Sequence, residues 1–429
     1  MANTATLAII GGGAAGLCAA IFAARNIRAL AGEGAPVRVI LFEKNPRVGK
    51  KLLTTGNGRC NLTNTDLSLR HFHGAQPKLA ADILSRFGTQ QILDFFGGLG
   101  LLFTTTPEGL VYPRSLQAGS VLDALRAEAA RLGVETLCGL EIKNAAKEAR
   151  RFVISAPSRQ IRADALIIAT GSAASGGSAG GLSLLKAFGH KIVPFYPALC
   201  ALRCKSPELK TAAGMRARAG VALRIGGQTV RTESGEVQFA DGALSGIVVM
   251  QLSGAVSRHF CSGGKEPVEL VLDLMEEFSA QEVREMLFER RSTLAHLPLE
   301  DFLGGMLNKR VALAALKAAG TERLSRPVAE LTSAELDTLC ATLKGWRFAV
   351  TGTASPAQAQ VCGGGAALSG FDSHTLASRH IRGLYAAGEA LDLYGDCGGY
   401  NLSWAWASGA AAGIAAARQL ASLICSDCH

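Results

Sequence analysis

Residues Thr6–Arg25 read TLAIIGGGAAGLCAAIFAAR, a short apolar run followed by clustered glycines and then an alanine-rich stretch. The apolar run predicts a buried strand, and the alanine-rich stretch predicts a helix. Between them lies G-x-G-x-x-G, in the strand-to-helix setting that dinucleotide binding requires. Gly11 permits the tight turn, Gly13 lets a pyrophosphate approach the backbone, and Gly16 lets the helix pack closely on the strand.

The start of this helix and the end of the next strand predict two further parts of the site. Ala14 and Ala15 present free N–H groups and the positive end of the helix dipole to a diphosphate. A second strand, predicted at Val37–Phe42, ends at Glu43 and is followed by Lys44. An acid there can accept hydrogen bonds from the adenosine ribose and disfavours the 2′-phosphate of NADP. The alternative is an ordinary βαβ unit in which Glu43 is a solvated strand end.

Two distant stretches indicate that the dinucleotide is FAD. A predicted buried strand ends in Ala169, Thr170 and Gly171, the turn seen in flavoproteins with two dinucleotide-binding domains. Much later, Gly388 and Glu389 end a stretch that resembles the second flavin fingerprint of those proteins. There the glycine allows close approach, and the acid accepts a hydrogen bond from the ribityl chain. A simple NAD dehydrogenase needs neither stretch.

Composition limits the class of protein. With 429 residues, 48% of them hydrophobic and 18% charged, the chain can bury a large core and form two or three domains. A net charge of +9 favours anionic ligands, but the basic residues are dispersed and aromatics are few, so a nucleic-acid partner is possible without being favoured. Eleven irregularly spaced cysteines fit free thiols in a reducing cytoplasm, the expected location.

Three features can suggest a membrane or a metal. Met1–Ala24 and Cys397–Ala417 are uncharged and approach membrane-spanning length, but Gly, Ala and Ser interrupt or dominate them. We interpret both as buried segments and expect no membrane contact. The chain ends in Cys425–His429, which matches the short c-type haem attachment pattern. No export signal is evident, so we interpret the match as chance and assign no haem and no metal.

Two long motifs carry a resemblance to a known family. They are GKKLLTTGNGRCNLTN at Gly49–Asn64 and GDCGGYNL at Gly395–Leu402. Both resemble the HI0933-like flavoproteins, also described as aminoacetone-oxidase-family FAD-binding enzymes. The resemblance extends over most of the chain. It is weaker at Gly363–Leu368, where GGGAAL departs from the family's Gly-Gly-Val with an acid downstream, so substrate recognition can differ here.

The family pattern implies an α/β fold with an inserted domain. A Rossmann-like FAD-binding domain of the two-dinucleotide-binding-domain flavoprotein type is expected at residues 1–194 and 348–429. It encloses an inserted β-plus-helical domain at 195–347, and Gly345–Gly352 is expected to return to the flavin domain as a strand. Inside the insert, the patterns predict short strands over 221–238 with a turn at Gly226-Gly227, and helices over 280–288 and 306–319.

The resemblance also implies which loop lines the flavin. The polar, glycine-rich loop Thr55–Asn64 follows the ribose-binding strand and can reach along the cofactor. Arg59 can stabilise the N1–C2=O region of reduced flavin or a substrate carboxylate, while Asn57 and Asn61 orient by hydrogen bonds. The alternative is a structural loop whose Asn residues satisfy turn backbone. By resemblance the cofactor-lining residues here are Lys51, Asn57, Gly58, Arg59, Cys60 and Asn61.

A second implied flavin contact comes near the C-terminus. Gly399, Tyr400 and Asn401 precede a small-residue helix predicted over 403–417, whose N-terminus points at the flavin pyrimidine ring. Its dipole would stabilise negative charge there. Tyr400 has three interpretations: ring stacking, a proton-relay hydroxyl and core packing. We take Tyr400, Arg59 and Asn61 as the catalytic candidates.

These features predict an FAD-dependent oxidoreductase that transfers hydride between flavin N5 and a small organic substrate or NAD(P)H. The family name points to amine-type oxidation or to NAD(P)H-linked reduction, and the sequence does not choose. No second clear G-x-G-x-x-G is present, so NAD(P)H is considered only as a transient electron donor. The substrate and the oligomeric state are not readable.

Three alternatives remain open. One is a flavoprotein acting on RNA, since some tRNA-modifying enzymes share this FAD domain. Another is an FAD-linked thiol/disulfide reductase using Cys60, although no second cysteine lies close in sequence. The third is a flavin-binding regulator without turnover. The histidines, among them His71, His73 and His190, show no metal-site spacing and are interpreted as surface or packing residues.

Overall fold

The computed structural model describes residues 4–156, 159–177 and 180–426. The chain forms two compact units. We call Met1–Phe195 with Val361–His429 the split unit, and Tyr196–Gln360 the inserted unit. The first boundary therefore lies one residue from the predicted 194/195 boundary.

The second boundary corrects the prediction. The return to the split unit comes at Val361 rather than at residue 348. β18 (Trp346–Thr353) is a strand, as expected, but it pairs with β13 (Leu202–Lys205) and β17 (Val268–Asp273) of the inserted unit. The prediction failed because alternation of apolar residues identifies a strand without identifying the sheet that takes it.

A five-stranded sheet in the order β20-β11-β1-β2-β7 forms the centre of the split unit. β1 (Ala5–Ile10) is fully buried and lies parallel to β2 (Val37–Phe42) and β11 (Ala165–Ile168), which confirms the three predicted strands. The outer strands β20 (Leu384–Ala386) and β7 (Glu135–Leu137) are also parallel to their neighbours. Because all five strands are parallel, their carboxyl ends meet at one edge, where α/β proteins bind ligands.

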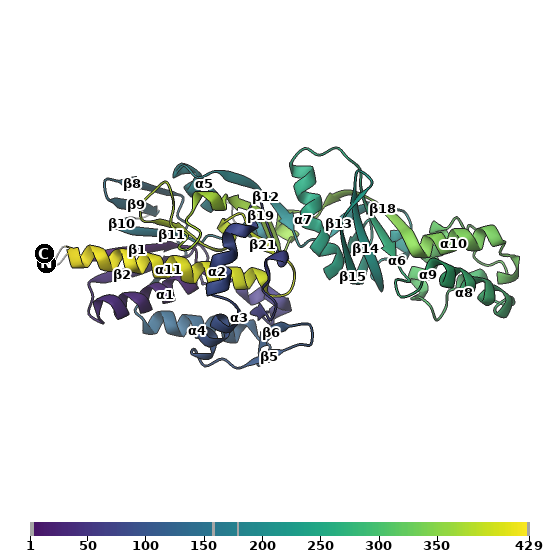
Figure 1. Ribbon diagram of the computed structural model, residues 1–429, viewed down its shortest axis with the longest axis horizontal. Helices are drawn as coiled ribbons and strands as arrows, with labels where there is room; N and C mark the ends of the chain where they lie inside the picture. The colour runs from purple at the N-terminus through teal and green to yellow at the C-terminus, as the bar shows by residue number, and fades with distance from the viewer. Residues whose placement is uncertain (1–3, 157–158, 178–179, 427–429) are drawn as a thin grey trace. The chain divides into compact units, whose positions relative to one another are not determined.

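Two helices from opposite ends of the chain pack side by side in the split unit. They are α1 (Ala14–Ala31) and α11 (Tyr400–Ser426), seen together in Figure 1. A Cβ on Gly413 would lie 2.3 Å from the backbone oxygen of Ala19, and Gly409 approaches α1 equally closely. The two helices therefore touch backbone to backbone, which only small residues allow.

The long apolar stretches are helices of this core. In the described ranges, α1 is a helix long and apolar enough to cross a membrane by length and composition. More than half of that window is buried within the unit, as expected of a core helix. Trp404 and Trp406 of α11 are also buried, in two different apolar clusters.

Short elements complete the split unit. β3 (Thr63–Asn64) pairs with β6 (Leu110–Pro113), and β4 (Phe72–His73) pairs with β21 (Tyr394–Gly395). Further elements are α2 (Ala81–Arg86), α3 (Thr89–Gly97), β5 (Phe103–Thr105), α4 (Ala118–Arg131), β8 (Asn144–Glu148), β9 (Arg151–Ala156), β10 (Arg159–Ala163), α5 (Gly180–Ala187), β12 (Ile192–Ala198) and β19 (Val361–Ala366).

The inserted unit is built on a closed barrel in the order β13-β16-β15-β14-β17-β18. β14 (Arg216–Ile225) and β15 (Gln228–Ala240) form a hairpin. Gly226 and Gly227 both have positive φ at its turn, as predicted. Alternate residues of β17 are buried, so the barrel interior is filled by one face of each strand. The remaining elements include β16 (Ala243–Ser245), α6 (Leu209–Ala212) and α7 (Ile247–Cys261).

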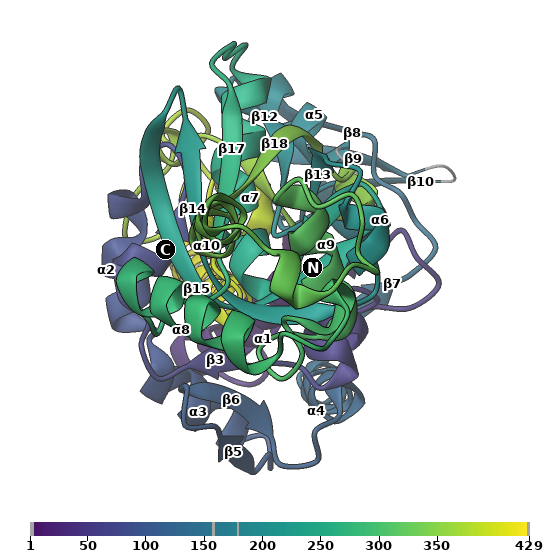
Figure 2. The same cartoon turned by 90° about the vertical axis from the view of Figure 1, so that its right-hand side faces the viewer.

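Three helices follow within the inserted unit. α8 (Ala280–Thr293), α9 (Lys309–Ala318) and α10 (Ser333–Gly345) lie together beside the barrel strands (Figure 2). The first two confirm the helices predicted over 280–288 and 306–319. Their buried residues join the barrel in a single apolar core.

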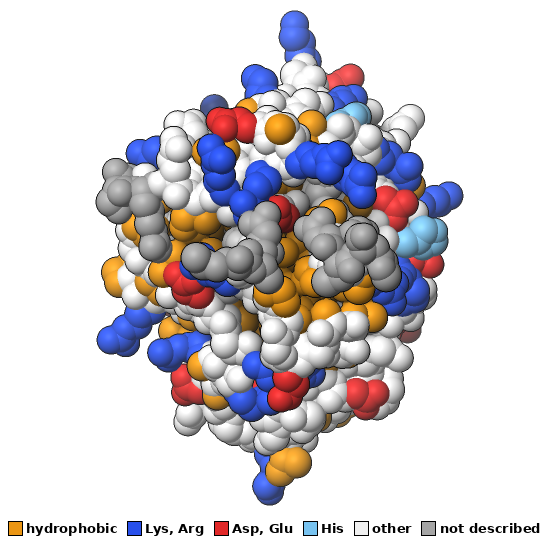
Figure 3. Space-filling model, turned by 90° about the vertical axis from the view of Figure 1, so that its left-hand side faces the viewer, with side chains coloured by type: hydrophobic (Ala, Val, Ile, Leu, Met, Phe, Trp, Pro, Cys, Tyr) orange, Lys and Arg blue, Asp and Glu red, His pale blue; other side chains and the backbone are white. Residues whose placement is uncertain are grey.

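The surface charge is mixed on the face drawn in Figure 3. Lys and Arg side chains there are interspersed with acidic and apolar side chains. The net charge of +9 is therefore not gathered into one patch on that face.

Candidate functional site

The loop between β1 and α1 lies at the carboxyl edge of the sheet. A Cβ on Gly11 would lie 2.3 Å from the backbone oxygen of Ala169, and a Cβ on Gly16 would lie 1.8 Å from that of Gly11. These two glycines are thus required by packing inside the protein. Gly13 differs, because no atom of the described residues lies within 4 Å of where its Cβ would be. Its open side leaves the backbone accessible to a ligand.

The N-terminus of α1 suits an anion. Its N-cap is Gly13, which makes no side-chain cap hydrogen bond, and the first turn holds no acidic residue. The first amides of a helix lack partners inside the helix, and the dipole adds positive potential there. The predicted residues Gly13, Ala14 and Ala15 therefore form a cradle that fits a diphosphate.

Glu43, at the end of β2, is buried and fixes the glycine loop. Its Oε2 accepts a hydrogen bond from the Gly12 N–H at 2.8 Å, and its Oε1 accepts one from the Asn45 N–H at 2.8 Å. The interpretation as a solvated strand end is wrong, since the residue is only 7% exposed. Ribose binding by Glu43 stays a prediction, as does cofactor binding by the exposed Lys44.

The second predicted fingerprint meets the first at the same edge. Glu389 is ion-paired with Lys51, with Nζ and Oε2 2.6 Å apart, and accepts a hydrogen bond from the Ser172 hydroxyl at 2.8 Å. Gly388 has φ +68° and donates its N–H to the Ser408 hydroxyl of α11. Ser172 follows the Ala169–Gly171 turn, so the structure brings these separately predicted segments together.

The loop predicted to line the flavin contains the 3-10 helix η1 (Leu52–Gly58). Asn57 has φ +55° and is exposed, as is Arg59, so both side chains are accessible to a ligand. Cys60 is fully buried, and burial raises the pKa of its thiol to about 12. Such a thiol lacks the thiolate character that disulfide exchange requires.

Two asparagine side chains of the motifs are engaged by backbone. The Asn61 amide donates to the Thr63 carbonyl at 3.0 Å and accepts from the Gly399 N–H at 3.1 Å. Asn401 accepts from the Gly395 N–H and donates to the Gly395 carbonyl, both at 2.8 Å. Both side chains thus stabilise the backbone that leads into α11. For Asn61 this agrees with the alternative of a structural loop whose Asn residues satisfy turn backbone. A catalytic role for Asn61 stays a prediction that these contacts do not support.

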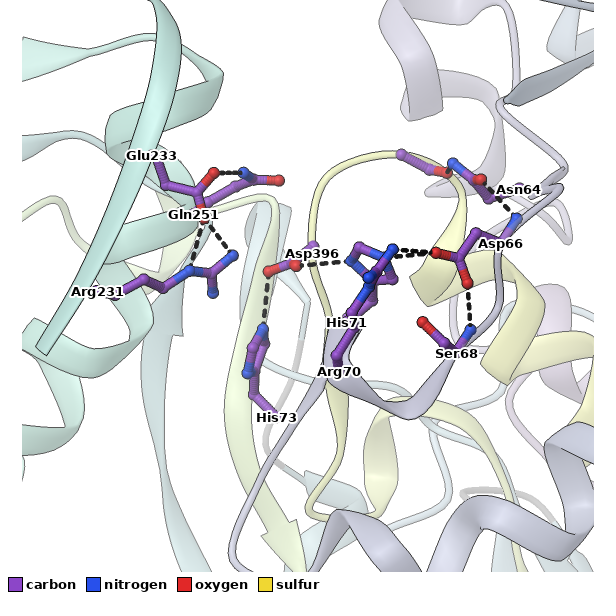
Figure 4. Close-up of polar contacts among 12 residues, drawn as sticks. Asn64, Asp66, Ser68, Arg70, His71, His73, Arg231, Glu233, Gln251 and Asp396 are labelled. Carbon is purple, nitrogen blue, oxygen red and sulfur yellow. Dashed lines mark hydrogen bonds and ion pairs between the residues drawn. The ribbon is translucent and has the colours of Figure 1, made fainter. Parts of the chain in front are cut away.

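A cluster of polar side chains beside the start of α11 was missed by sequence reasoning. Figure 4 shows His71 and His73 turned toward the carboxylate of Asp396. His71 Nδ1 lies 3.1 Å from Asp396 Oδ2, and His73 Nε2 lies 2.7 Å from Asp396 Oδ1. His71 Nε2 also lies 3.3 Å from Asp66 Oδ2. The two histidines, interpreted above as surface or packing residues, therefore belong to a titratable network.

Tyr400 lies against this network. Its ring stacks on His71, with centroids 4.4 Å apart. Burial, with the nearby charges of Asp66 and Asp396, raises the pKa of its hydroxyl to about 12. The side chain is thus a protonated phenol at neutral pH, and its burial against His71 and Phe72 agrees with core packing. A catalytic role for Tyr400 stays a prediction.

Within the described ranges, no group of three His, Cys, Asp or Glu side chains could hold a metal ion. The last part of the haem-like terminal pattern, residues 427–429, lies outside the described residues.

Fold and site together define a flavoprotein of the Rossmann type, and the residues described fit FAD. The family described as "HI0933-like protein Rossmann domain" matches residues 5–415. The chain therefore belongs to the HI0933-like family of FAD-dependent oxidoreductases.

Named relatives cover nearly the whole chain. A 3-dehydro-bile acid delta(4,6)-reductase of Clostridium scindens is 38% identical over 96% of this chain and 99% of its own. A ribosomal RNA dihydrouridine synthase of Escherichia coli is 27% identical over 93% of this chain and 95% of its own. A solved 3-ketosteroid-Δ4-(5α)-dehydrogenase from Rhodococcus jostii is 17% identical, covers 96% of this chain and 97% of its own, and gives a TM-score of 0.46.

Proposed function

We propose that this protein is an FAD-dependent reductase of a carbon–carbon double bond conjugated to a carbonyl, acting on a small, largely apolar molecule. The observation that carries the proposal is the 38% identity over nearly full length to a 3-dehydro-bile acid delta(4,6)-reductase. That name describes an oxidised 3-position beside double bonds at positions 4 and 6. Dihydrouridine formation in the more distant relative likewise saturates a double bond next to a carbonyl.

The chain's own residues have distinct tasks in this proposal. The N-terminus of α1 would hold the diphosphate of FAD, and Gly388 and Glu389 would bind its ribityl chain. When bound, FAD supplies a hydride donor at N5. The exposed guanidinium of Arg59 and the N-terminus of α11 would stabilise negative charge at the flavin or at a substrate oxygen.

NAD(P)H is the proposed donor of electrons, docking transiently. Double-bond reduction consumes two electrons per turnover, and the names of the two relatives both describe products that are more reduced than their substrates. Amine-type oxidation, the other expectation from the family name, runs in the opposite direction and has less support.

RNA as substrate is the competing outcome. It is supported by the 27% identity to the ribosomal RNA dihydrouridine synthase and by the net charge of +9. The higher identity to the bile acid reductase favours the small molecule, and the basic side chains are dispersed on the face drawn in Figure 3.

Anaerobic half-reactions test the proposal. The FAD-loaded protein is reduced with NADH or NADPH and then mixed with a 4-en-3-one steroid, a 4,6-dien-3-one steroid, an unmodified ribosomal RNA fragment or a primary amine. We expect the nicotinamide to bleach the flavin band near roughly 450 nm and the enones to restore it. Reoxidation by RNA but not by the enones would overturn the small-molecule proposal. Bleaching of the oxidised protein by the amine alone would make it an oxidase.

A further inference from the structure

The carboxylate of Glu389 is nearly saturated with hydrogen-bond donors. The Lys51 ammonium lies 2.8 Å from its Oε1 and 2.6 Å from its Oε2, and the Ser172 hydroxyl donates to Oε2 at 2.8 Å. An ionised carboxylate offers about four acceptor positions, so these contacts leave about one of them for a ligand. The Glu389 side chain is 14% exposed and that of Lys51 is 37% exposed. Glu389 is therefore present in the cofactor site as half of a partly buried ion pair.

This ion pair lies beside the N-terminus of α1. A Cβ on Gly388 would lie 2.9 Å from the Cβ of Ala15, in the first turn of that helix. Ser172 directly follows the Ala169–Gly171 turn at the carboxyl end of β11, on the edge of the sheet where the glycine loop lies. Glu389 is thus adjacent to the cradle that fits the cofactor diphosphate.

The two carboxylates at this edge are compensated in different ways. Glu43 accepts hydrogen bonds from the backbone N–H groups of Gly12 and Asn45, so its charge meets partial positive charges. In the described part of the chain, Glu389 has one ion-pair partner, Lys51. Without that partner, a partly buried carboxylate would face the negative diphosphate across a medium that screens charge poorly. Lys51 therefore places a full positive charge where an acid would otherwise repel the cofactor.

We propose that Lys51 raises the affinity for the cofactor indirectly, by cancelling the charge of Glu389, and does not itself contact the diphosphate. Ser172 helps to orient the carboxylate, whose remaining acceptor position is left for a ribityl hydroxyl. Lys51 is then a positioning residue. The proposal requires FAD as the cofactor but does not depend on which substrate the protein reduces.

Two alternatives for Lys51 predict different results. If Lys51 contacts the cofactor directly, as the family resemblance implies, its loss should weaken binding equally whether or not residue 389 is charged. If the ion pair instead blocks acceptor positions that FAD requires, its loss should strengthen binding. Under our proposal the loss of Lys51 weakens binding, and does so only while residue 389 carries a negative charge.

A double-mutant cycle, measured by titrating FAD into FAD-free protein, tests the proposal. The four proteins are the parent, Lys51→Met, Glu389→Gln and the double variant. We expect Lys51→Met to weaken FAD binding by about 10-fold or more, which is about 1.4 kcal/mol. In the Glu389→Gln background the same change should alter the affinity by less than about 2-fold, as for sites that do not interact. Equal losses in both backgrounds, unchanged affinity in Lys51→Met, or tighter binding in that variant would each overturn the proposal.

A conservative variant and added salt separate the effect of charge from that of packing. Lys51→Arg keeps the positive charge and should bind FAD within about 3-fold of the parent, because a guanidinium also pairs with a carboxylate. Added salt screens an unpaired carboxylate, so it should narrow the difference in affinity between Lys51→Met and the parent. If the difference is the same at low and high salt, and Lys51→Arg binds as weakly as Lys51→Met, the loss is one of packing and the proposal is wrong.

A matched control removes another ion pair of the split unit. Arg38 is exposed and lies 2.6 Å from Glu135, near the end of β2 opposite to Glu43. Arg38→Met should therefore leave FAD affinity unchanged. Equal weakening in this control would mean that any loss of positive charge weakens binding, which would also overturn the proposal. These titrations need no turnover, so a failure of enones to reoxidise the flavin would overturn the proposed function alone.

Discussion

Two helices of the inserted unit begin differently from α1 of the split unit. In the inserted unit, the side chains of Ser279 and Thr332 cap α8 and α10 by accepting hydrogen bonds from the N–H groups of Glu282 and Glu335. Both form capping boxes, a device that typically stabilises by about 1 kcal/mol. In the split unit, α1 begins at Gly13 with no such cap and no acid in its first turn. These two helices of the inserted unit satisfy their first amides from within, whereas α1 leaves its first amides for a ligand.

The largest expected effect comes from capping α1 with an acidic side chain. Gly13 has φ −83° and free space on its Cβ side, so Gly13→Asp is sterically allowed. The new carboxylate would occupy the amides and repel the diphosphate, so we expect FAD to bind about 100-fold more weakly, about 2.7 kcal/mol. Gly13→Ala is the matched control without charge. Titration of FAD-free protein measures both, and unchanged FAD affinity in Gly13→Asp would remove α1 from the cofactor site.

The second prediction concerns the packing of α1 on α11. The Cβ introduced by Gly413→Ala would lie 2.3 Å from the backbone oxygen of Ala19, so the helices must separate. We expect a loss of about 2–3 kcal/mol in the free energy of unfolding, the upper end for overpacking. Gly119→Ala in α4 meets no atom within 4 Å and should be neutral or stabilising by up to about 1 kcal/mol. Urea unfolding compares the two variants, and equal effects would mean that the helices are not in close contact.

The split unit should also be the more acid-sensitive through His190. Burial, with the nearby charge of His380, lowers the pKa of His190 from 6.5 to about 4. The unfolded chain therefore binds a proton that the folded protein does not, so stability is lost as pH falls below about 6.5. We expect a loss of about 2 kcal/mol between pH 7.5 and 5 from this group. His190→Asn should be less stable at both pH values but should lack this part of the pH dependence in thermal unfolding.

The smallest effect should come from removing a cap in the inserted unit. Thr332→Ala deletes the hydroxyl that accepts from the Glu335 N–H at 3.2 Å, and we expect a loss of about 1 kcal/mol. FAD affinity should stay the same, because α10 lies in the inserted unit. Calorimetry with and without FAD measures both quantities. A change in FAD affinity comparable to that of Gly13→Asp would show that the two kinds of helix start are not functionally separate.

The parts of the fold that the sequence predicted are those where backbones touch. Gly11 and Gly16 have no room for a side chain, so their positions are visible as glycines in the sequence. The bounds of β2 were predicted correctly. Its last four residues are all buried, so they form a continuous apolar run in the sequence. β18 requires only alternating apolar residues for its packing. The pattern therefore predicted the strand correctly, but we assigned it to the wrong unit.

The candidate site was less readable for a physical reason. His71 and Asp396 are 325 positions apart, and no local spacing links a histidine to a carboxylate that the fold alone brings near. Asn61 and Asn401 could be recognised as motif residues in the sequence. Their side chains, however, form hydrogen bonds with backbone groups of the protein. A conspicuous motif residue is therefore as compatible with shaping a loop as with touching the cofactor.

The contact between α1 and α11 determines which parts of the protein can fold first during synthesis. The Cys18 thiol donates to the Trp406 carbonyl, across 388 positions of the chain. The ribosome therefore finishes the inserted unit, with all its strand partners in place, well before α11 emerges to pack on α1. Until then α1 presents apolar residues without their native cover, a stage at which a nascent chain is open to aggregation and to chaperones.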